Sequence, residues 1–319
     1  MKTLSSCTIS VPSKAFLIGE YAVLLGLPAV IFTFSPRFKI VSEIQGEMVL
    51  DSWTQGSPVS RLSDWMRERC FPAVTGQFYD PYQSQGGFGA STAQFAMVYQ
   101  QSAQRSEGLD LSWKAVLKLY QELMKDEPLV PSGGDLVAQW QGGVIAFDPV
   151  FGGSVEDLGE FFKSFSFLVF SATGQPGRKV PTHSHLEALA RRKFTDSKLT
   201  LKSALLKSVL AQTIQKALEA IRKGDEMILG QAMSQFADIL HQEGLEVQST
   251  WEDRQMLGQL PGVLGVKGAG ALQSDAVLVL LRSADFLSTR ERVIEEAQSR
   301  GLTLVANGVT LESGVMCET

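Results

Sequence analysis

Hydrophobic residues recur every three or four positions in several stretches of the chain, which is the spacing of a helix that buries one face. The clearest case lies in the second half, where Leu201, Leu205, Val209 and Ile221 share such a face and Gly224 supplies a stop. The pattern predicts helices at 60–70, 93–99, 113–124, 136–140, 201–221, 227–241 and 283–300.

Other apolar stretches are continuous rather than periodic, which is typical of strands buried in a sheet. Residues 276–281 form such a run. Residues 5–44 are rich in Val, Ile and Phe but are broken by glycine and proline, so short strands and turns are expected there. Residues 262–270 have the composition of a glycine-rich turn. Further strands are predicted at 144–147, 165–171 and 302–306.

Strands therefore fall in both halves of the chain with helices between them, which predicts an α+β protein. The length of 319 residues allows two ordinary domains, and a hydrophobic content of 44% suits a substantial core. We expect the boundary near residue 165, with one domain at 1–165 and the second at 166–319.

The net charge of −5 gives no support to a nucleic-acid or membrane role. Three widely spaced cysteines, Cys7, Cys70 and Cys317, indicate reduced thiols rather than a disulfide framework or a zinc site. No secretory signal is evident, and Glu20 with glycine and proline interrupts the apolar stretch 15–32. We expect a cytoplasmic protein with no nucleic-acid or membrane partner, and a homodimer is left open.

The segment 85–93 reads QGGFGASTA, with three glycines ahead of two hydroxyl residues and a predicted helix. Glycine lets the backbone approach a ligand closely, and the first turn of a helix presents unpaired N–H groups with partial positive charge. Together they form a cradle for a phosphate. The alternative is a plain glycine-rich turn that happens to precede a helix.

The sequence contains neither G-x-x-x-x-G-K-[ST] nor HExxH, and the glycine segment lacks the third glycine of G-x-G-x-x-G. Three other segments attract attention. Lys14 and Glu20 stand alone in apolar surroundings, where a buried charge needs a partner; the alternative is two surface residues on an edge strand. Residues 131–135 read PSGGD, and residues 266–271 read VKGAGA with Asp275 soon after.

In sequence order these four segments resemble the motifs of the GHMP kinases, the superfamily of galactokinase, homoserine kinase, mevalonate kinase and phosphomevalonate kinase. Lys14 with GEYAVL at 19–24 resembles the first motif, and GFGASTA at 87–93 resembles the second, usually written GLGSSAA. KGAG at 267–270 resembles the third, and PSGGD resembles the PSGxD segment of mevalonate kinases. Each motif alone is weak, but four in order are specific.

The resemblance implies a two-domain fold with an N-terminal ribosomal-S5-domain-2-like α/β domain that binds ATP and a ferredoxin-like C-terminal domain. It also implies ATP and Mg²⁺ as cofactors, and an active site between the domains. The loop would hold ATP through Gly86, Gly87, Gly89, Ala90, Ser91 and Thr92, with Ser91 as a Mg²⁺ ligand. Asp135 would accept or orient the acceptor hydroxyl, and Lys14 would stabilise charge beside it. The alternative is an ion pair that only ties two segments together.

The acceptor implied is a small acidic alcohol. The segment SATGQPGRK at 171–179 resembles phosphomevalonate kinases, so phosphomevalonate ranks first and mevalonate is the close alternative. Arg178 and Lys179 are candidates to bind a substrate phosphate, although two ordinary charges on a solvated loop are an equal alternative. The other substrate-side residues implied are Glu20, Ser132, Gly133, Lys267, Gly268 and Gly270.

The chain also departs from the family pattern. Ala90 replaces the first serine of GLGSS, and Met124 stands where mevalonate kinases carry a glutamate that binds magnesium. The third motif lacks the long glycine run. Because of these departures, an alternative of another class stays open, in which the protein is a relative that binds a nucleotide or a metabolite without catalysis.

Overall fold

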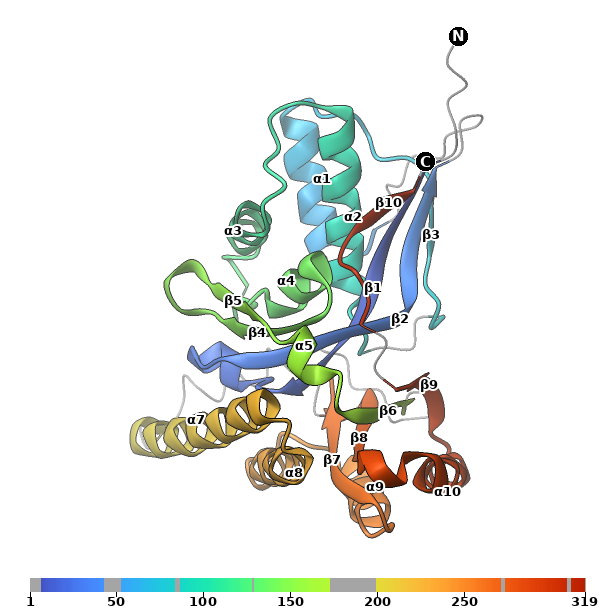
Figure 1. Cartoon of the computed structure of the whole chain (residues 1–319). Helices are drawn as coiled ribbons and strands as arrows, with labels where there is room; N and C mark the ends of the chain where they lie inside the picture. The colour runs from blue at the N-terminus through green and yellow to red at the C-terminus, as the bar shows by residue number, and fades with distance from the viewer. Residues whose placement is uncertain are drawn as a thin grey trace.

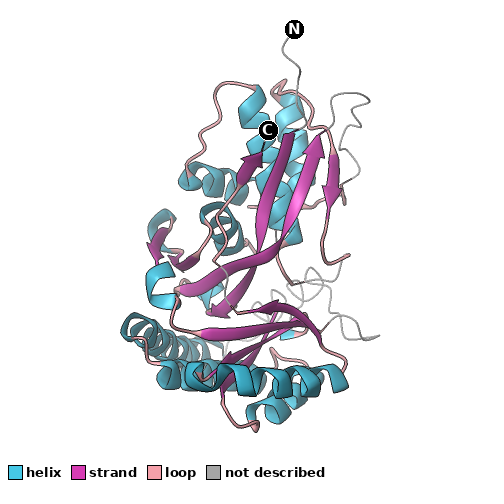
Figure 2. Cartoon of the chain, turned by 45° about the vertical axis from the view of Figure 1, so that its right-hand side comes forward, coloured by secondary structure: helices cyan, strands magenta, loops and turns pink. Residues whose placement is uncertain are grey.

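The computed structural model of the chain describes residues 7–42, 53–83, 87–127, 129–172, 199–270, 273–308 and 311–318. These residues form two antiparallel sheets, one of six strands and one of four. Helices accompany each sheet, and the smaller sheet with its helices lies below the long strands of the larger one in Figure 1. Figure 2 shows the same arrangement from another side. The predicted α+β class is confirmed.

The first sheet has the strand order β10-β1-β2-β4-β5, with β3 paired to β2. Its strands are β1 (Cys7–Ile18), β2 (Ala29–Ser42), β3 (Gln77–Tyr79), β4 (Val144–Asp148), β5 (Ser154–Asp157) and β10 (Met316–Glu318). A short 3₁₀ helix, η1 (Ala22–Leu25), joins β1 to β2. The strand predicted at 144–147 is thereby confirmed.

Strands β1 and β2 are long, so the expectation of short strands over 5–44 was wrong for the described part of that range, whereas the expected turn is present between them at 19–28. Of the two prolines that argued for turns, Pro28 lies just before β2, and Pro36 lies at an irregularity of the ladder, where the register shifts between Val11 and Ser13. Pro12 lies in this shift and Pro36 lies opposite it. A proline at a bulge removes no ladder hydrogen bond, so the strands continue through it.

Helices α1 (Pro58–Glu68), α2 (Ala90–Arg105), α3 (Trp113–Leu123) and α4 (Gly134–Gln141) pack beside the first sheet, and α2 and α4 contact β1 directly. Two of these helices, α1 and α3, are capped at the N-terminus by a serine side chain. Ser57 accepts a hydrogen bond from the backbone of Ser60, and Ser112 accepts one from that of Ala115, each at 3.3 Å. The helices predicted at 60–70, 93–99, 113–124 and 136–140 are confirmed, with their ends shifted by a few residues.

The second sheet has the order β7-β8-β6-β9. Its strands are β6 (Ser166–Ser171), β7 (Val263–Ala269), β8 (Ala276–Leu281) and β9 (Thr303–Asn307). The helices of this part are α7 (Leu199–Lys223), α8 (Glu226–Gln242), α9 (Gln248–Gly258) and α10 (Phe286–Ser299), with the short η4 (Ser283–Asp285). The short η2 (Val150–Gly152) joins β4 to β5 of the first sheet, and α5 (Gly159–Phe162) lies between β5 and β6. None of the helices in the described ranges is long and apolar enough to cross a membrane.

Two elements of this part differ from expectation. Residues 262–270 are strand β7 rather than a turn, because Gly265 packs on Gly230 of α8 instead of bending the chain. Helix α9 was not predicted. Its buried residues include Asp253 and Arg254, so hydrophobic periodicity does not reveal it. The helices predicted at 201–221, 227–241 and 283–300 and the strands predicted at 165–171, 276–281 and 302–306 are confirmed.

A continuous hydrophobic core joins the two sheets. Phe32 of β2 stacks on Phe162 and on Phe167 of β6, with ring centroids 6.0 and 6.1 Å apart. The C-terminal end of the described chain returns to the first sheet, where β10 pairs with β1. Residues 311–318 therefore run beside the first sheet, not within the second domain of 166–319 in which we placed them; the boundary near 165 itself stays a prediction.

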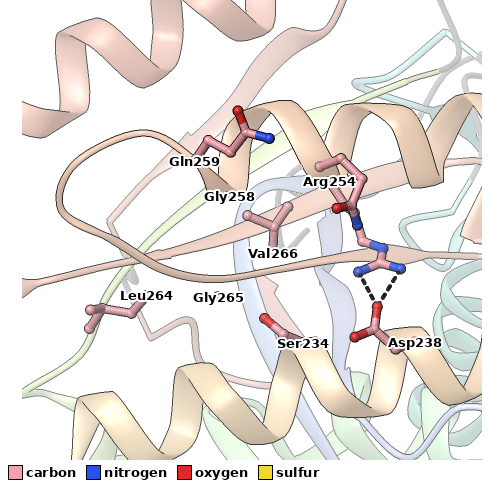
Figure 3. Close-up of a pocket in the computed structure, with 9 residues that line it drawn as sticks. Ser234, Asp238, Arg254, Gly258, Gln259, Leu264, Gly265 and Val266 are labelled. Carbon is pink, nitrogen blue, oxygen red and sulfur yellow. Dashed lines mark hydrogen bonds and ion pairs between the residues drawn. The ribbon is translucent and has the colours of Figure 1, made fainter.

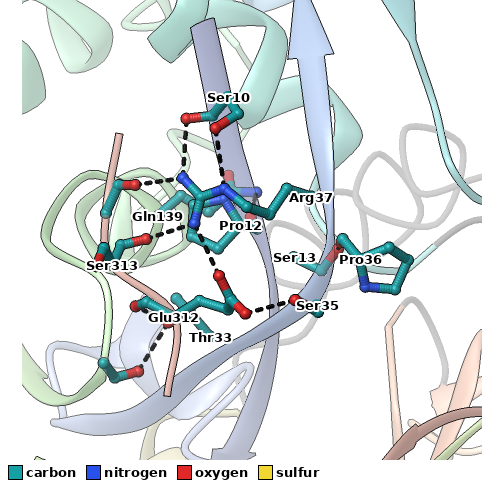
Figure 4. Close-up of polar contacts among 12 residues, drawn as sticks. Ser10, Pro12, Ser13, Thr33, Ser35, Pro36, Arg37, Gln139, Glu312 and Ser313 are labelled. Atoms are coloured by element: carbon teal, nitrogen blue, oxygen red, sulfur yellow. Dashed lines mark hydrogen bonds and ion pairs between the residues drawn. The ribbon is translucent and has the colours of Figure 1, made fainter. Parts of the chain in front are cut away.

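Arg37 of β2 holds this returning segment against the first sheet (Figure 4). Its Nη2 donates to the carbonyl oxygens of Ser10 at 3.0 Å and Gly314 at 2.6 Å, and its Nη1 donates to that of Ser313 at 2.8 Å. Nη1 also pairs with the Glu312 carboxylate at 3.2 Å. Burial lowers the pKa of Arg37, and Glu312 opposes that shift. One guanidinium thus joins β1, β2 and the last segment of the chain.

The contact between α8 and β7 generates a prediction about stability. A Cβ on Gly230 would lie 2.3 Å from the backbone oxygen of Leu264, whereas a Cβ on Gly258 in α9 would meet nothing within 4 Å. Gly230→Ala is expected to lower the free energy of unfolding by about 1–3 kcal/mol, because backbone must move to admit the methyl group. Gly258→Ala, the matched control, is expected to leave it unchanged or raise it by less than about 1 kcal/mol. Equal effects in urea titrations would contradict this account.

Candidate functional site

The glycine loop leads directly into helix α2. Gly89 has φ +93° and stands immediately before Ala90, the first residue of α2. A Cβ at this position would lie 2.8 Å from Gln139 Nε2 and 3.1 Å from Lys14 Cε, so the loop runs close to both side chains. Ser91 is exposed in the first turn, where backbone N–H groups have no partner within the helix. Gly86 lies outside the described residues.

Lys14 and Asp135 meet beside this loop. Lys14 Nζ lies 3.1 Å from Asp135 Oδ2, with Lys14 buried and Asp135 partly exposed. The backbone N–H of Lys14 donates to the carbonyl oxygen of Phe88 at 3.1 Å, which ties β1 to the loop. Asp135 Oδ1 is buried and has no hydrogen-bond partner among the described residues. The structure thus brings the first motif, the second motif and the PSG turn together, and leaves one carboxylate oxygen able to accept a proton.

The PSG turn places Asp135 at the start of α4. Ser132 Oγ accepts a hydrogen bond from the backbone of Gly134 at 3.2 Å, and Gln121 donates to the Ser132 carbonyl oxygen at 3.1 Å. Gly133 has φ +79°, and a Cβ there would lie 2.2 Å from Leu117 Cδ1. In this structure Ser132 and Gly133 shape the turn, and their contact with a substrate stays a prediction.

Glu20 and Lys267 form a buried ion pair between the two sheets. Lys267 Nζ also donates to the carbonyl oxygens of Phe16 at 3.3 Å and Gly268 at 2.5 Å, so its three protons have three acceptors. Gln273 donates to the same Glu20 oxygen at 2.8 Å. Burial lowers the pKa of Lys267, and Glu20 opposes that shift. We predicted that Glu20 and Lys267 contact the substrate. In this structure their ion pair joins the first motif to the third.

The second and third motifs meet at Asp275. A Cβ on Gly87 would lie 2.4 Å from the Cβ of Asp275, and one on Gly270 would lie 2.1 Å from its Oδ2. Asp275 is buried, so its carboxylate stands between the two glycine segments. The sequence drew attention to Asp275 only as a neighbour of the third motif, and its position at the glycine loop comes from the packing of the two sheets.

One buried polar residue of the site was missed. Gln139 lies one turn after Asp135 on α4 and has no exposed surface. Its amide donates to the Pro12 carbonyl oxygen at 2.9 Å and to that of Gly89 at 3.1 Å, and accepts from the Thr92 hydroxyl at 2.6 Å. Thr92, which we assigned to ATP, therefore turns its hydroxyl inward. The signal in the sequence was a glutamine four residues after Asp135 within an apolar run.

The departures from the family pattern have structural counterparts. Met124 is buried in the hydrophobic core and offers no oxygen ligand, and Glu127, a nearby acid, pairs with Arg61. Within the described ranges no group of three His, Cys, Asp or Glu residues is placed to hold a metal. Arg178 and Lys179 lie outside the described residues, so their predicted contact with a phosphate has no structural counterpart.

A cavity of about 230 Å³ lies elsewhere, between α8, α9 and β7 (Figure 3). Arg254 at its wall pairs with Asp238 at 3.1 Å and with Glu246 at 2.7 Å, so its charge is neutralised within the protein. None of the predicted site residues lines this cavity. It is therefore distinct from the meeting point of the motifs.

No protein-family model and no curated protein matches the sequence. Several solved structures do match the fold. Lactococcus lactis galactokinase complexed with galactose has a TM-score of 0.73 at 13% identity, over 98% of this chain and 95% of that one. Methanococcus jannaschii mevalonate kinase has 0.69 at 16% identity, over 95% and 98%. Streptococcus pneumoniae phosphomevalonate kinase in complex with phosphomevalonate and AMPPNP has 0.68 at 13% identity, over 95% and 99%.

These matches span nearly the whole chain and agree with the fold that the four sequence motifs implied. The chain therefore has the same fold as these galactokinase, mevalonate kinase and phosphomevalonate kinase structures.

Proposed function

We propose that the protein is an ATP-dependent kinase that transfers the γ-phosphoryl group to the hydroxyl of a small acidic alcohol, with phosphomevalonate as the first candidate. The observation that carries the proposal is the contact of Lys14 with Asp135 at 3.1 Å, beside a glycine loop that opens a helix. Phosphoryl transfer depends on positioning and charge neutralisation, and these residues can supply both.

In this proposal the loop of Gly87, Gly89 and Ala90 binds the triphosphate through backbone N–H groups at the start of α2. The acceptor oxygen attacks the γ-phosphorus, the bond from that phosphorus to the β,γ-bridging oxygen breaks, and ADP leaves. The hydroxyl proton passes to the unpartnered Oδ1 of Asp135. The Lys14 ammonium stabilises negative charge that develops on the transferring group.

The residues present are compatible with Mg²⁺. Ser91 offers an exposed hydroxyl at the loop, which is a hard oxygen donor. Asp275 brings a further carboxylate against Gly87. When bound with ATP, Mg²⁺ would neutralise phosphate charge. Since the side chain of Met124 has no oxygen, we propose that Ser91 is the Mg²⁺ ligand of the family pattern that this chain retains.

The acceptor is tested by measuring ADP release with a panel of mevalonate, 5-phosphomevalonate, homoserine and galactose. Turnover with 5-phosphomevalonate above all others is expected. Preference for mevalonate would select the alternative acceptor and would show that Arg178 and Lys179 do not read a phosphate. If the protein binds ATP but releases no ADP with any acceptor in the panel, the kinase proposal is wrong and the non-catalytic nucleotide-binding alternative holds.

Asp135→Asn is expected to lower kcat by about 10²–10⁴-fold, because the amide cannot take the hydroxyl proton. The dissociation constant for ATP should be nearly unchanged, since Asp135 is assigned to the acceptor side. Initial rates and calorimetric titration with a non-hydrolysable ATP analogue measure the two quantities. Asp64→Asn on the exposed surface of α1 serves as the control. An Asp135→Asn enzyme that keeps full kcat removes this carboxylate from the mechanism.

Gly89→Ala is expected to weaken nucleotide binding at least about tenfold, equivalent to about 1.4 kcal/mol. Its methyl group would crowd Gln139 and Lys14 and displace the loop. Gly108→Ala is the matched control, because Gly108 also has a positive φ, +102°, but a Cβ there meets nothing within 4 Å. Both variants carry similar backbone strain, so a loss of affinity in Gly89→Ala alone indicates the phosphate loop. Equal affinities in two folded variants would contradict the cradle.

A further inference from the structure

Gln139 joins three segments that meet at the candidate site. Figure 4 shows its side chain beside Pro12 of β1. One amide N–H bonds to the Pro12 carbonyl oxygen, two residues before Lys14, and the other bonds to that of Gly89, immediately before α2. The amide oxygen accepts from Thr92 in the first turn of α2. Both donors of the buried amide are used, which leaves no freedom to rotate.

The polarity of these contacts requires an amide. Two carbonyl oxygens face Nε2, which donates to both, and the Thr92 hydroxyl donates to Oε1. A methionine of similar size would supply neither donor and would leave the Pro12 and Gly89 oxygens without this partner. Because Gln139 also lies one turn after Asp135 on α4, its contacts set where the carboxylate stands relative to the loop and to Lys14.

We propose that Gln139 is a positioning residue for phosphoryl transfer, one that keeps Lys14 and Asp135 aligned with the phosphate loop; this inference rests on the proposed kinase function. The loop has two anchors that do not involve Gln139. The Lys14 backbone N–H donates to the Phe88 carbonyl oxygen at 3.1 Å, and the Ala93 backbone N–H donates to that of Gly89 at 2.9 Å. Loss of Gln139 therefore disturbs alignment more than it disturbs nucleotide binding.

The test compares Gln139→Met with Gln141→Met, its matched control, which changes an exposed glutamine two residues further along α4. Gln139→Met is expected to lower kcat by about ten- to hundredfold, the loss typical of a small misplacement of reacting groups. The dissociation constant for a non-hydrolysable ATP analogue should change far less than kcat. Gln141→Met should keep both values, and thermal unfolding of each variant confirms that the proteins fold.

A double-mutant cycle sharpens the test and provides a second, milder variant. Thr92→Val removes only the hydroxyl, so Gln139 keeps both carbonyl contacts and the loss of kcat should be smaller. The contribution of Thr92 is expected to run through Gln139, so Thr92→Val should cost no further activity in the Gln139→Met background. Full additivity of the two losses would overturn the proposed connection.

The outcomes separate this inference from the function on which it rests. If the wild-type protein turns over an acceptor and Gln139→Met has the same kcat, the positioning role is overturned and the kinase proposal stands. Equal losses in nucleotide affinity and kcat would also overturn it, because the residue would then act on binding. An absence of wild-type turnover with every acceptor would overturn the kinase proposal and this inference with it.

Discussion

The buried pair of Lys267 and Glu20 is the contact on which the arrangement of the two sheets depends. A buried ammonium is stable only when its protons are all bonded, and removing one partner of such a pair typically costs about 3–5 kcal/mol. Lys267 meets this requirement by taking oxygens from both sheets. The first motif is thereby held against the third, and Asp275 lies against Gly87 of the glycine loop.

The same need to satisfy buried polar groups organises the site within the first sheet. The buried Lys14 forms an ion pair with Asp135. The buried Gln139 forms hydrogen bonds with Pro12, Gly89 and Thr92. A network in which the members are bonded is rigid, and rigidity is what positioning of reacting groups requires. Asp135 Oδ1 is the exception in this group, because it has no hydrogen-bond partner among the described residues.

Prediction from the sequence worked where local pattern and tertiary role agree. The positions of helix α7 and strand β8 were anticipated, and the apolar run of β8 is buried throughout. On α7 Ile214 and Ile221 are buried as expected, whereas Leu205, which we placed on the buried face, is exposed. Prediction failed where packing overrides local preference. Strands β1 and β2 run through prolines at a ladder irregularity, Gly265 serves close packing rather than a turn, and α9 buries ion-paired side chains instead of an apolar face.

The sequence by itself determined the α+β class and singled out the four motif segments, because a backbone with positive φ, as at Gly89 before α2, favours glycine. It also singled out Lys14 and Asp135. Only the tertiary structure decided that Glu20 and Lys267 pair, that Thr92 faces inward and that Gln139 belongs to the site. These are contacts between residues far apart in the chain, and the partner of a buried polar group depends on how the elements pack, which local sequence does not encode.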